Sequence, residues 1–229
     1  MIFVTGDTHG DMDFAKMEVL ATRTPPLTRN DYVIIAGDFG GIWSEQTLER
    51  DLKPYEELPY TVLFVDGNHE NFELLNAYPV SEWKGGKVHV IKPNILHLMR
   101  GQVYEIEGKT FFTFGGATST DKFFRKAYVS WWPEETPTDD DMVEAIENLK
   151  KVGNKVNYIV THTIDEKGLY YPPLKRGSFQ FDSFPENRLF SYFEDTVAYD
   201  HWYFGHYHLD GNLTDKKRVL YNDIVKLNV

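Results

Sequence analysis

Side chains that can bind metal ions follow five short apolar segments of this chain. In chain order, the motifs are Asp7-x-His9, Gly37-Asp38, Gly67-Asn68-His69-Glu70, His162 and Gly205-His206-x-His208. Each motif alone is weak, because Asp-x-His pairs and Gly-Asp turns are common. Their recurrence after five separate segments is hard to explain by turn chemistry. It predicts that these side chains form one shared site.

The candidate ligands offer oxygen and imidazole nitrogen but no thiolate, since the chain contains no cysteine. Such donors suit borderline divalent ions, namely Mn, Fe, Zn, Co or Ni, better than they suit calcium. One bridging carboxylate would let the set serve two ions. Two such ions outweigh the charge of two aspartates and attract phosphate. The donor set therefore predicts a cationic centre in an otherwise acidic protein.

The five apolar segments are predicted to be buried strands, because they are continuously apolar rather than alternating. Stretches compatible with helices separate the first three, which gives a βαβαβ order and hence a parallel sheet. In such sheets the loops at the carboxyl ends of the strands meet at one edge, so distant side chains can converge. The predicted strands cover residues 1–5, 31–36, 60–65, 156–161 and 201–204.

Helices and further strands complete the predicted architecture. Helices are expected over residues 12–22, from Ser44 towards Pro54, over 70–77, from Thr138 onwards and over 187–198. Turn residues interrupt segment 87–114, which indicates hairpins of a second sheet. Short, antiparallel strands are expected at 218–221 and 224–227. We predict a single α/β domain over residues 1–229, in which two sheets lie between helices.

In order and approximate spacing, the motifs resemble those of the calcineurin-like metallophosphoesterase superfamily, and they span residues 7–208. Residues 130–134, Ser-Trp-Trp-Pro-Glu, are similar to a small bacterial and phage-borne branch of it. The resemblance implies a four-layer α/β/β/α sandwich, with two mixed sheets flanked by helices. It implies one metal ion on Asp7, His9, Asp38 and His208, and another on Asp38, Asn68, His162 and His206.

The resemblance also implies a reaction. The two divalent ions, with Mn the expected ion in vitro, would share Asp38 and hold a bridging hydroxide that attacks phosphorus in line. Asp38 is thus expected to be both ligand and catalytic residue. His69 would lie over the substrate phosphate, where it stabilises developing charge or protonates the departing oxygen. The expected substrate is a small phosphomonoester or phosphodiester, such as a nucleotide.

The second motif departs from the family pattern. Many members continue it as Gly-Asp-x-x-Asp, and the protein Ser/Thr phosphatases add an arginine that clamps phosphate. Here the sequence reads Gly37-Asp38-Phe39-Gly40-Gly41-Ile42-Trp43. Loss of a bidentate arginine removes charge and geometry, which disfavours the alternative of a phosphoprotein phosphatase. Acidic charge disfavours a nuclease, and the complete donor set disfavours a non-catalytic scaffold.

Two insertions, residues 117–137 and 164–185, are expected to contact substrate. Both contain aromatic and basic residues. We expect Trp132, Tyr170 or Tyr171 to stack on a base or aryl group, and Arg125 or Arg176 to bind phosphate. The alternative for the second insertion is a flap that covers the edge of the sandwich.

The composition excludes several classes of protein. The 229 residues carry a formal net charge of −11, which argues against a stable nucleic-acid complex. Hydrophobic residues make up 41 %, an ordinary globular value. No apolar run reaches the roughly 18 residues of a membrane helix, and the first residues do not resemble a signal peptide. We therefore expect a cytoplasmic protein without a membrane partner, and the sequence makes no prediction of oligomeric state.

Overall fold

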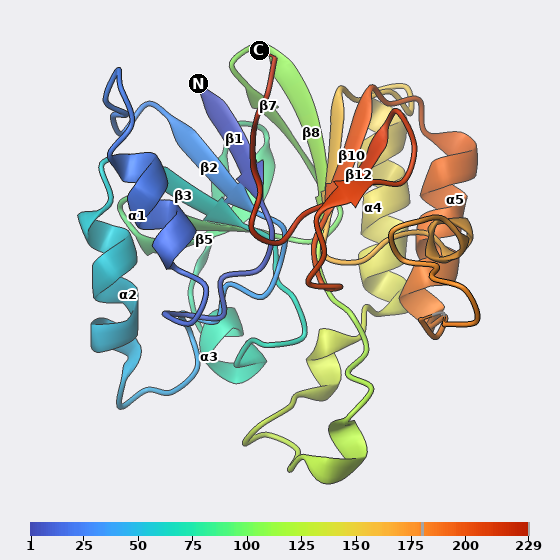
Figure 1. The fold of residues 1–229 in the computed structure, drawn as a ribbon. Coiled ribbons are helices and arrows are strands. Elements are labelled where there is room, and N and C mark those ends of the chain that lie inside the picture. Colours follow the sequence, from blue (N-terminus) through green and yellow to red (C-terminus); the bar gives the residue numbers. More distant parts are fainter. Residues whose placement is uncertain (180, 229) are drawn as a thin grey trace.

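The computed structural model describes residues 1–179 and 181–228, and over these residues the strands form two mixed sheets (Figure 1). The sheets pack face to face, and helices cover the outer face of each sheet. This arrangement confirms the predicted α/β fold class, with two mixed sheets flanked by helices.

The first sheet is built mainly from the N-terminal part of the chain. Its order is β13 (Ile224–Lys226), β1 (Ile2–Thr5), β2 (Tyr32–Ile35), β3 (Thr61–Phe64), β6 (Ile95–Leu98), β5 (Gly86–Lys92) and β4 (Val80–Trp83). Strands β1, β2, β3 and β6 are mutually parallel, as the βαβαβ order predicts for the first three. Strands β13, β5 and β4 pair antiparallel with their neighbours.

The second sheet has a similar plan. Its order is β11 (Gly211–Asn212), β12 (Lys217–Val219), β10 (His201–Phe204), β9 (Tyr158–Thr161), β8 (Lys109–Phe114) and β7 (Gln102–Ile106). The strands from β12 to β8 are parallel, and β11 and β7 pair antiparallel at the two edges. Strands of like direction in both sheets place their carboxyl ends at defined edges, where loops can supply functional groups.

Apolar side chains fill three layers, one between the two sheets and one between each sheet and its helices. Helices α1 (Ala15–Ala21), α2 (Leu48–Glu57) and α3 (Phe72–Asn76) pack on the first sheet, whereas α4 (Asp139–Lys151) and α5 (Pro185–Thr196) pack on the second. Successive residues of a strand point to opposite faces. In β1, Phe3 therefore joins the layer under the helices, while Ile2 and Val4 join the layer between the sheets.

Segment 87–114 differs from the prediction, because it does not form hairpins of one second sheet. Strands β5 and β6 extend the first sheet, and β7 and β8 belong to the second. The reason is that β6 pairs in parallel with β3, in the register Val62 to Ile95 and Phe64 to His97. The chain then crosses between the sheets near Gly101, whose N–H donates to the carbonyl of Thr113 in β8.

Two helix starts also differ from the prediction. Helix α1 begins at Ala15, because the preceding turn is closed by the N–H of Asp13 bonding to the carbonyl of Thr8. Helix α2 begins at Leu48 and contains Pro54, whereas Ser44 bonds to Gln46 instead of capping the helix. Strands β12 and β13 pair antiparallel with β11 and β1, as predicted for the short C-terminal strands, and β12 is also parallel to β10. Thr138 caps α4 as predicted, in a reciprocal capping box with Asp141.

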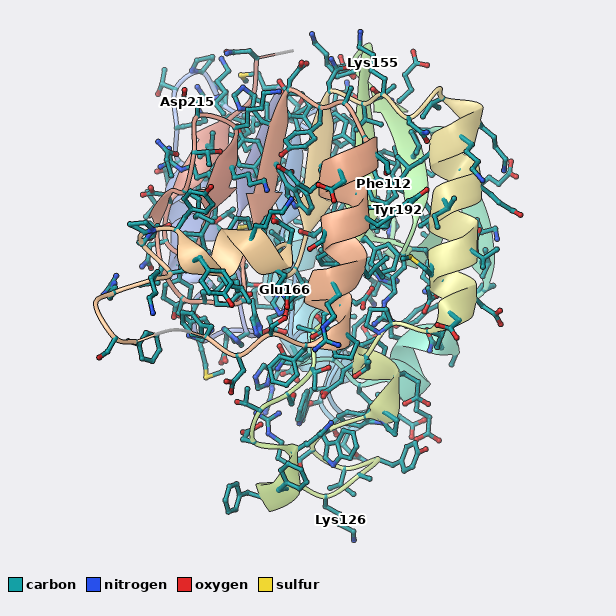
Figure 2. The ribbon with its side chains drawn as sticks, turned by 90° about the vertical axis from the view of Figure 1, so that its right-hand side faces the viewer. Phe112, Lys126, Lys155, Glu166, Tyr192 and Asp215 are labelled. Atoms are coloured by element: carbon teal, nitrogen blue, oxygen red, sulfur yellow. The ribbon has the colours of Figure 1, made fainter. Side chains whose placement is uncertain are left out.

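Segment 117–137 projects beyond the four layers, at the end of the molecule where α3 lies (Figure 1). It contains the short 3-10 helices η1 (Lys122–Phe124) and η2 (Pro133–Glu135), and Lys126 lies at its far end (Figure 2). Segment 164–185 contains η3 (Glu166–Tyr170), which packs against α5. The helices within residues 1–179 and 181–228 are all too short or too polar to cross a membrane.

Candidate active site

The loops after β1, β2, β3, β9 and β10 bring the predicted ligands together from both sheets. Asp7, His9, Asp38 and Asn68 come from the first sheet, and His162, His206 and His208 come from the second. All the predicted metal ligands therefore lie in one region, between the carboxyl ends of strands that belong to different layers.

One group of donors surrounds Asp7 and one oxygen of Asp38. Ligand atoms of Asp7, His9, Asp38 and His208 all lie within 4.8 Å of one another. Nε2 of His9 is 3.3 Å from Oδ2 of Asp38, and Nε2 of His208 is 3.3 Å from Oδ2 of Asp7. Two carboxylates and two imidazoles thus face a common point.

A second group uses the other oxygen of Asp38. Ligand atoms of Asp38, His162 and His206 again lie within 4.8 Å of one another. Nε2 of His162 is 3.3 Å from Oδ1 of Asp38, 3.1 Å from Oδ1 of Asn68 and 3.2 Å from Nδ1 of His206. Asp38 therefore presents one oxygen to each group, which is the geometry of a bridging ligand.

Four of these residues have backbone conformations that residues other than glycine rarely adopt. The φ angles are 45° at His9, 47° at Asp38, 69° at His206 and 48° at His208. Left-handed conformations at non-glycine residues are uncommon, and they cluster where surrounding structure holds a functional group in place. The concentration of these left-handed residues at the site indicates that the turns are determined by the direction in which their side chains must point, and not by the most favourable backbone conformation.

Two glycines let ligands from different strands approach closely. A Cβ added to Gly37 would lie 1.9 Å from Nδ1 of His162, and one added to Gly205 would lie 2.1 Å from Oδ1 of Asp7. Any side chain at either position would displace a ligand. These glycines therefore belong to the site, although they have no donor side chain.

The two buried aspartates attract positive charge. Burial disfavours a charged imidazole, but Asp38 and Asp7 outweigh this effect and raise the pKa of His9 to about 9 and that of His162 to about 10. Burial and the charge of His162 lower the pKa of His206 to about 3. Carboxylates that favour nearby positive charge, together with imidazole and carboxamide donors, are suitable ligands for borderline divalent cations.

Several residues that the sequence reasoning missed hold the ligands in position. Asp13 lies 2.8 Å from Nδ1 of His9, and it accepts a hydrogen bond from the hydroxyl of Tyr221. The Tyr221 ring stacks on His208 at 4.7 Å. Such outer partners fix ring orientation at metal sites. The spacing of Asp13, one helical turn after His9, was a signal for its role, whereas nothing in the sequence pointed to Tyr221.

The orientation of Asn68 depends on the first insertion. Its Nδ2 donates to Oγ of Ser119, and that hydroxyl donates to the buried carboxyl of Glu135. Oδ1 of Asn68 is thereby left to face His162. Ser119 and Glu135 lie within segment 117–137, so this insertion is tied to the site at its base.

His69 lies beside the two donor groups rather than within them. Its backbone N–H donates to Oδ1 of Asp38, and its ring lies edge-on to His9 with a centroid separation of 5.4 Å. Nη2 of Arg125 is 3.5 Å from Nε2 of His69, and Asp121 holds this guanidinium at 2.8 Å. Burial, with the nearby charge of Arg125, lowers the pKa of His69 although Asp38 opposes this.

The other predicted substrate residues lie elsewhere. Trp132 is 2 % exposed and packs edge-to-face on Trp43, so its ring cannot stack on a substrate, and this prediction is wrong. Tyr170 is exposed in η3, and Nε of Arg176 donates to the carbonyl of Pro173. Their segment approaches the site through Phe181, which packs on Tyr207, the neighbour of His206.

The fold and this donor set define a metal-dependent hydrolase of the α/β/β/α class. The model of the calcineurin-like phosphoesterase family matches residues 1–210. The chain belongs to this family, as its motifs indicated, and it is a metal-dependent phosphoester hydrolase.

Solved structures are similar to this chain at low sequence identity. A candidate 5′-nucleotidase from Staphylococcus aureus, solved with alpha-ketoglutarate, has a TM-score of 0.50 and 12% identity, over 96% of this chain and 48% of that chain. Phosphopantetheinyl hydrolase from Mycobacterium tuberculosis has a TM-score of 0.47 and 17% identity, over 96% and 87%. Protein AQ665 from Aquifex aeolicus, of unknown function, has a TM-score of 0.37 and 15% identity, over 72% and 79%.

The first of these structures supports the fold alone. A search of curated proteins gives no match.

Proposed function

We propose that this protein hydrolyses phosphomonoester or phosphodiester bonds of small substrates, including nucleotides, with two divalent metal ions. The observation that carries the proposal is the position of Asp38, which presents Oδ2 to His9 and Oδ1 to His162. A carboxylate shared by two donor groups supports two ions rather than one.

The residues of the chain divide into two metal-binding groups and a substrate-facing pair. Asp7, His9 and His208 would hold one ion and Asn68, His162 and His206 the other, with Asp38 between them. When bound, the ions supply positive charge to the phosphoryl oxygens and lower the pKa of a coordinated water.

His69 and Arg125 form the substrate-facing pair. Arg125 can donate to phosphoryl oxygens from its position beside the ring of His69, and it is already oriented by Asp121. His69 can then stabilise charge on the departing oxygen or protonate it. Neither residue is needed to bind metal.

The position of Arg125 favours a second candidate, a phosphoprotein phosphatase. The second motif lacks the phosphate-clamping arginine of those enzymes, but Arg125 of segment 117–137 places a guanidinium beside His69. A phosphopeptide therefore belongs among the test substrates.

A metal analysis and a substrate panel test the proposal. We expect the Mn-loaded protein to contain two ions per chain and to hydrolyse an aryl phosphomonoester or phosphodiester. Cyclic nucleotides, dinucleoside polyphosphates and a phosphopeptide would then rank the natural classes. An Asp38→Asn variant should lose both metal content and turnover. Substoichiometric metal and no hydrolysis of any activated ester would instead identify a non-catalytic scaffold.

A further inference from the structure

A cavity of about 220 Å³ opens beside the two donor groups, and its lining is His9, Met12, Gly40, Trp43 and His69. His9 belongs to one of the donor groups, and the ring of His69 lies edge-on to that of His9. Trp43 and Met12 add an aromatic residue and a thioether residue to the same lining. The lining therefore combines imidazole residues at the metal-binding groups with two apolar residues.

We propose that this cavity binds a planar aromatic ring on the leaving-group side of the substrate. The proposal rests on the function proposed above, because the phosphate is placed at the metal-binding residues. A group attached to that phosphate and passing His69 enters the cavity that Met12 and Trp43 also line. Two kinds of substrate carry such a ring, namely an aryl phosphoester and a nucleotide with its nucleobase.

The size and chemistry of the walls favour a ring over a flexible polar group. An apolar cavity of about 150 Å³ in another protein is large enough to bind benzene, and this one is about 220 Å³. Indole rings stack on planar ligands, and methionine sulfur makes favourable contacts with aromatic edges. Met12 lines the cavity and is 76 % exposed, so its thioether is accessible to a bound ring.

Contacts with Trp132 and Asn71 hold Trp43 in place. Trp132 packs edge-to-face against it with a centroid separation of 5.4 Å, and Trp132 is itself part of the buried core. The carbonyl of Trp43 accepts a hydrogen bond from Asn71, the residue that caps α3. A preorganised ring loses little freedom when it binds a ligand, which is how a small contact area gains affinity.

Gly40 keeps the floor of the cavity close to His9. Its φ angle is +69°, and an added Cβ would lie 2.7 Å from the carbonyl carbon of His9. The Gly40 backbone therefore packs against the loop that carries two metal ligands. This contact holds one lining residue of the cavity against the loop of His9.

Calorimetric binding of phosphonates to the Mn-loaded protein tests the proposal without requiring hydrolysis. The probes are methylphosphonate, cyclohexylphosphonate, phenylphosphonate and a methylene-phosphonate analogue of adenosine monophosphate. We expect phenylphosphonate to bind about tenfold more tightly than methylphosphonate, the usual gain from stacking on one aromatic side chain. Cyclohexylphosphonate should bind more weakly than phenylphosphonate, because it fills the space without stacking.

Variants separate a contact with the ring from a structural effect. Trp43→Ala should remove the preference for phenylphosphonate, and Trp43→Phe should retain most of it. Methylphosphonate should bind both variants as it binds the native protein, because the phosphate end of the site is intact. Met12→Ala should weaken phenylphosphonate severalfold. Val19→Ala is the matched control, since Val19 is a similarly exposed apolar residue on α1, outside the cavity.

Equal affinity for the three simple phosphonates would overturn the inference, and so would a Trp43→Ala variant that weakens all of them equally. Tighter binding of the adenosine analogue than of phenylphosphonate would identify a nucleobase as the ring, and the reverse order would identify an aryl group. A protein that shows the aromatic preference but hydrolyses no ester would contradict the proposed function alone.

Discussion

The ring of His69 has a different partner from the rings of His9, His162 and His208. The rings of His9, His162 and His208 face aspartate oxygens, whereas the ring of His69 faces Arg125. A ring that faces a guanidinium rather than a carboxylate is poorly placed to bind a cation. It is well placed to contact a phosphoester that the guanidinium also contacts.

Replacement of His69 should therefore separate turnover from metal binding. We expect His69→Ala to keep two metal ions per chain but to lose about 10²- to 10⁴-fold in kcat, the usual contribution of general acid catalysis. The loss should be greatest for substrates with poor leaving groups, because these need help at the departing oxygen. Steady-state kinetics with alkyl and nitrophenyl esters measures this. An equal, small loss for both would assign His69 a purely structural role.

Arg125 and Arg176 were equal candidates for phosphate binding in the sequence, and the structure distinguishes them. Arg125 lies 3.5 Å from His69, whereas Arg176 donates to a carbonyl of its own loop. We expect Arg125→Ala to lower kcat/KM about 10- to 100-fold, since hydrogen bonds to charged groups contribute about 1.5–3 kcal/mol.

The Arg125→Lys variant should recover only part of this loss, because an ammonium lacks the bidentate geometry of a guanidinium. Arg176→Ala is the matched control, and its kcat/KM should stay close to that of the native protein. A larger loss in Arg176→Ala than in Arg125→Ala would move the phosphate contact to the second insertion.

Among single residues, candidate metal donors are easier to recognise in the sequence than candidate substrate contacts. The donors follow strands, and strand ends can be read from apolar segments. The residue that we propose for stacking could not be found in this way, because Trp132 and Trp43 differ in burial and not in type. Trp132 lies against the core, and the accessible indole beside the site belongs to Trp43, 89 positions earlier in the chain.

At the level of elements, β5 and β6 support the turn that carries Asn68 and His69. His89 of β5 shares a hydrogen bond of 3.1 Å with His97 of β6, and Nε2 of His97 lies 3.2 Å from Asp66. Arg100 donates to the same carboxyl. Burial would raise the pKa of Asp66, but Arg100 and His97 hold it well below its usual range.

This buried network should make stability depend on pH. Burial and the charge of His97 lower the pKa of His89 to about 4, against an ordinary value of 6.5, although Asp66 opposes the shift. Between pH 6.5 and 4 the unfolded chain takes up a proton that the folded chain excludes. Folding stability should therefore fall as pH falls through this window, by up to about 3 kcal/mol at 1.36 kcal/mol per pKa unit.

Denaturant unfolding of the native protein and of His89→Gln at several pH values measures this contribution. The substitution leaves in place the other charged and titratable residues that line the same cavity, namely Asp66, His97, Arg100, Glu134, Asp141 and Glu144. The difference at pH 8 serves as the baseline. The free energy of unfolding should decline less steeply in the variant below pH 6.5, and parallel curves would show that His89 does not titrate in this way.

The elements that the sequence misassigned join a sheet whose other strands are distant in the chain. Strand β6 pairs with β3 in the first sheet, whereas segment 87–114 was predicted to form a second sheet. Local turn residues predict hairpins but not the sheet that the hairpins join, since they report on neighbours in sequence only. The Thr138 capping box, which is entirely local, was predicted correctly.

For the molecule as a whole, the site joins the two sheets of the sandwich. Asp7, His9, Asp38 and Asn68 extend from the first sheet, and the other ligands extend from the second. The family resemblance predicted this layered fold, whereas composition alone indicated only an acidic globular protein. Since the donors meet only when both sheets are packed, a metal ion should bind the folded chain far better than the unfolded chain.

Mn should therefore stabilise the protein against global unfolding, and chelation should reverse the effect. At free Mn about a hundredfold above its Kd, linkage gives about 2.7 kcal/mol, which is a rise of several degrees in Tm for a chain of this length. His208→Ala should lose much of the rise because it removes a donor of the Asp7 group. His201→Ala, on the strand that precedes the same loop, should keep it. An unchanged Tm for the native protein in saturating Mn would mean that the seven donors do not act as one site in solution.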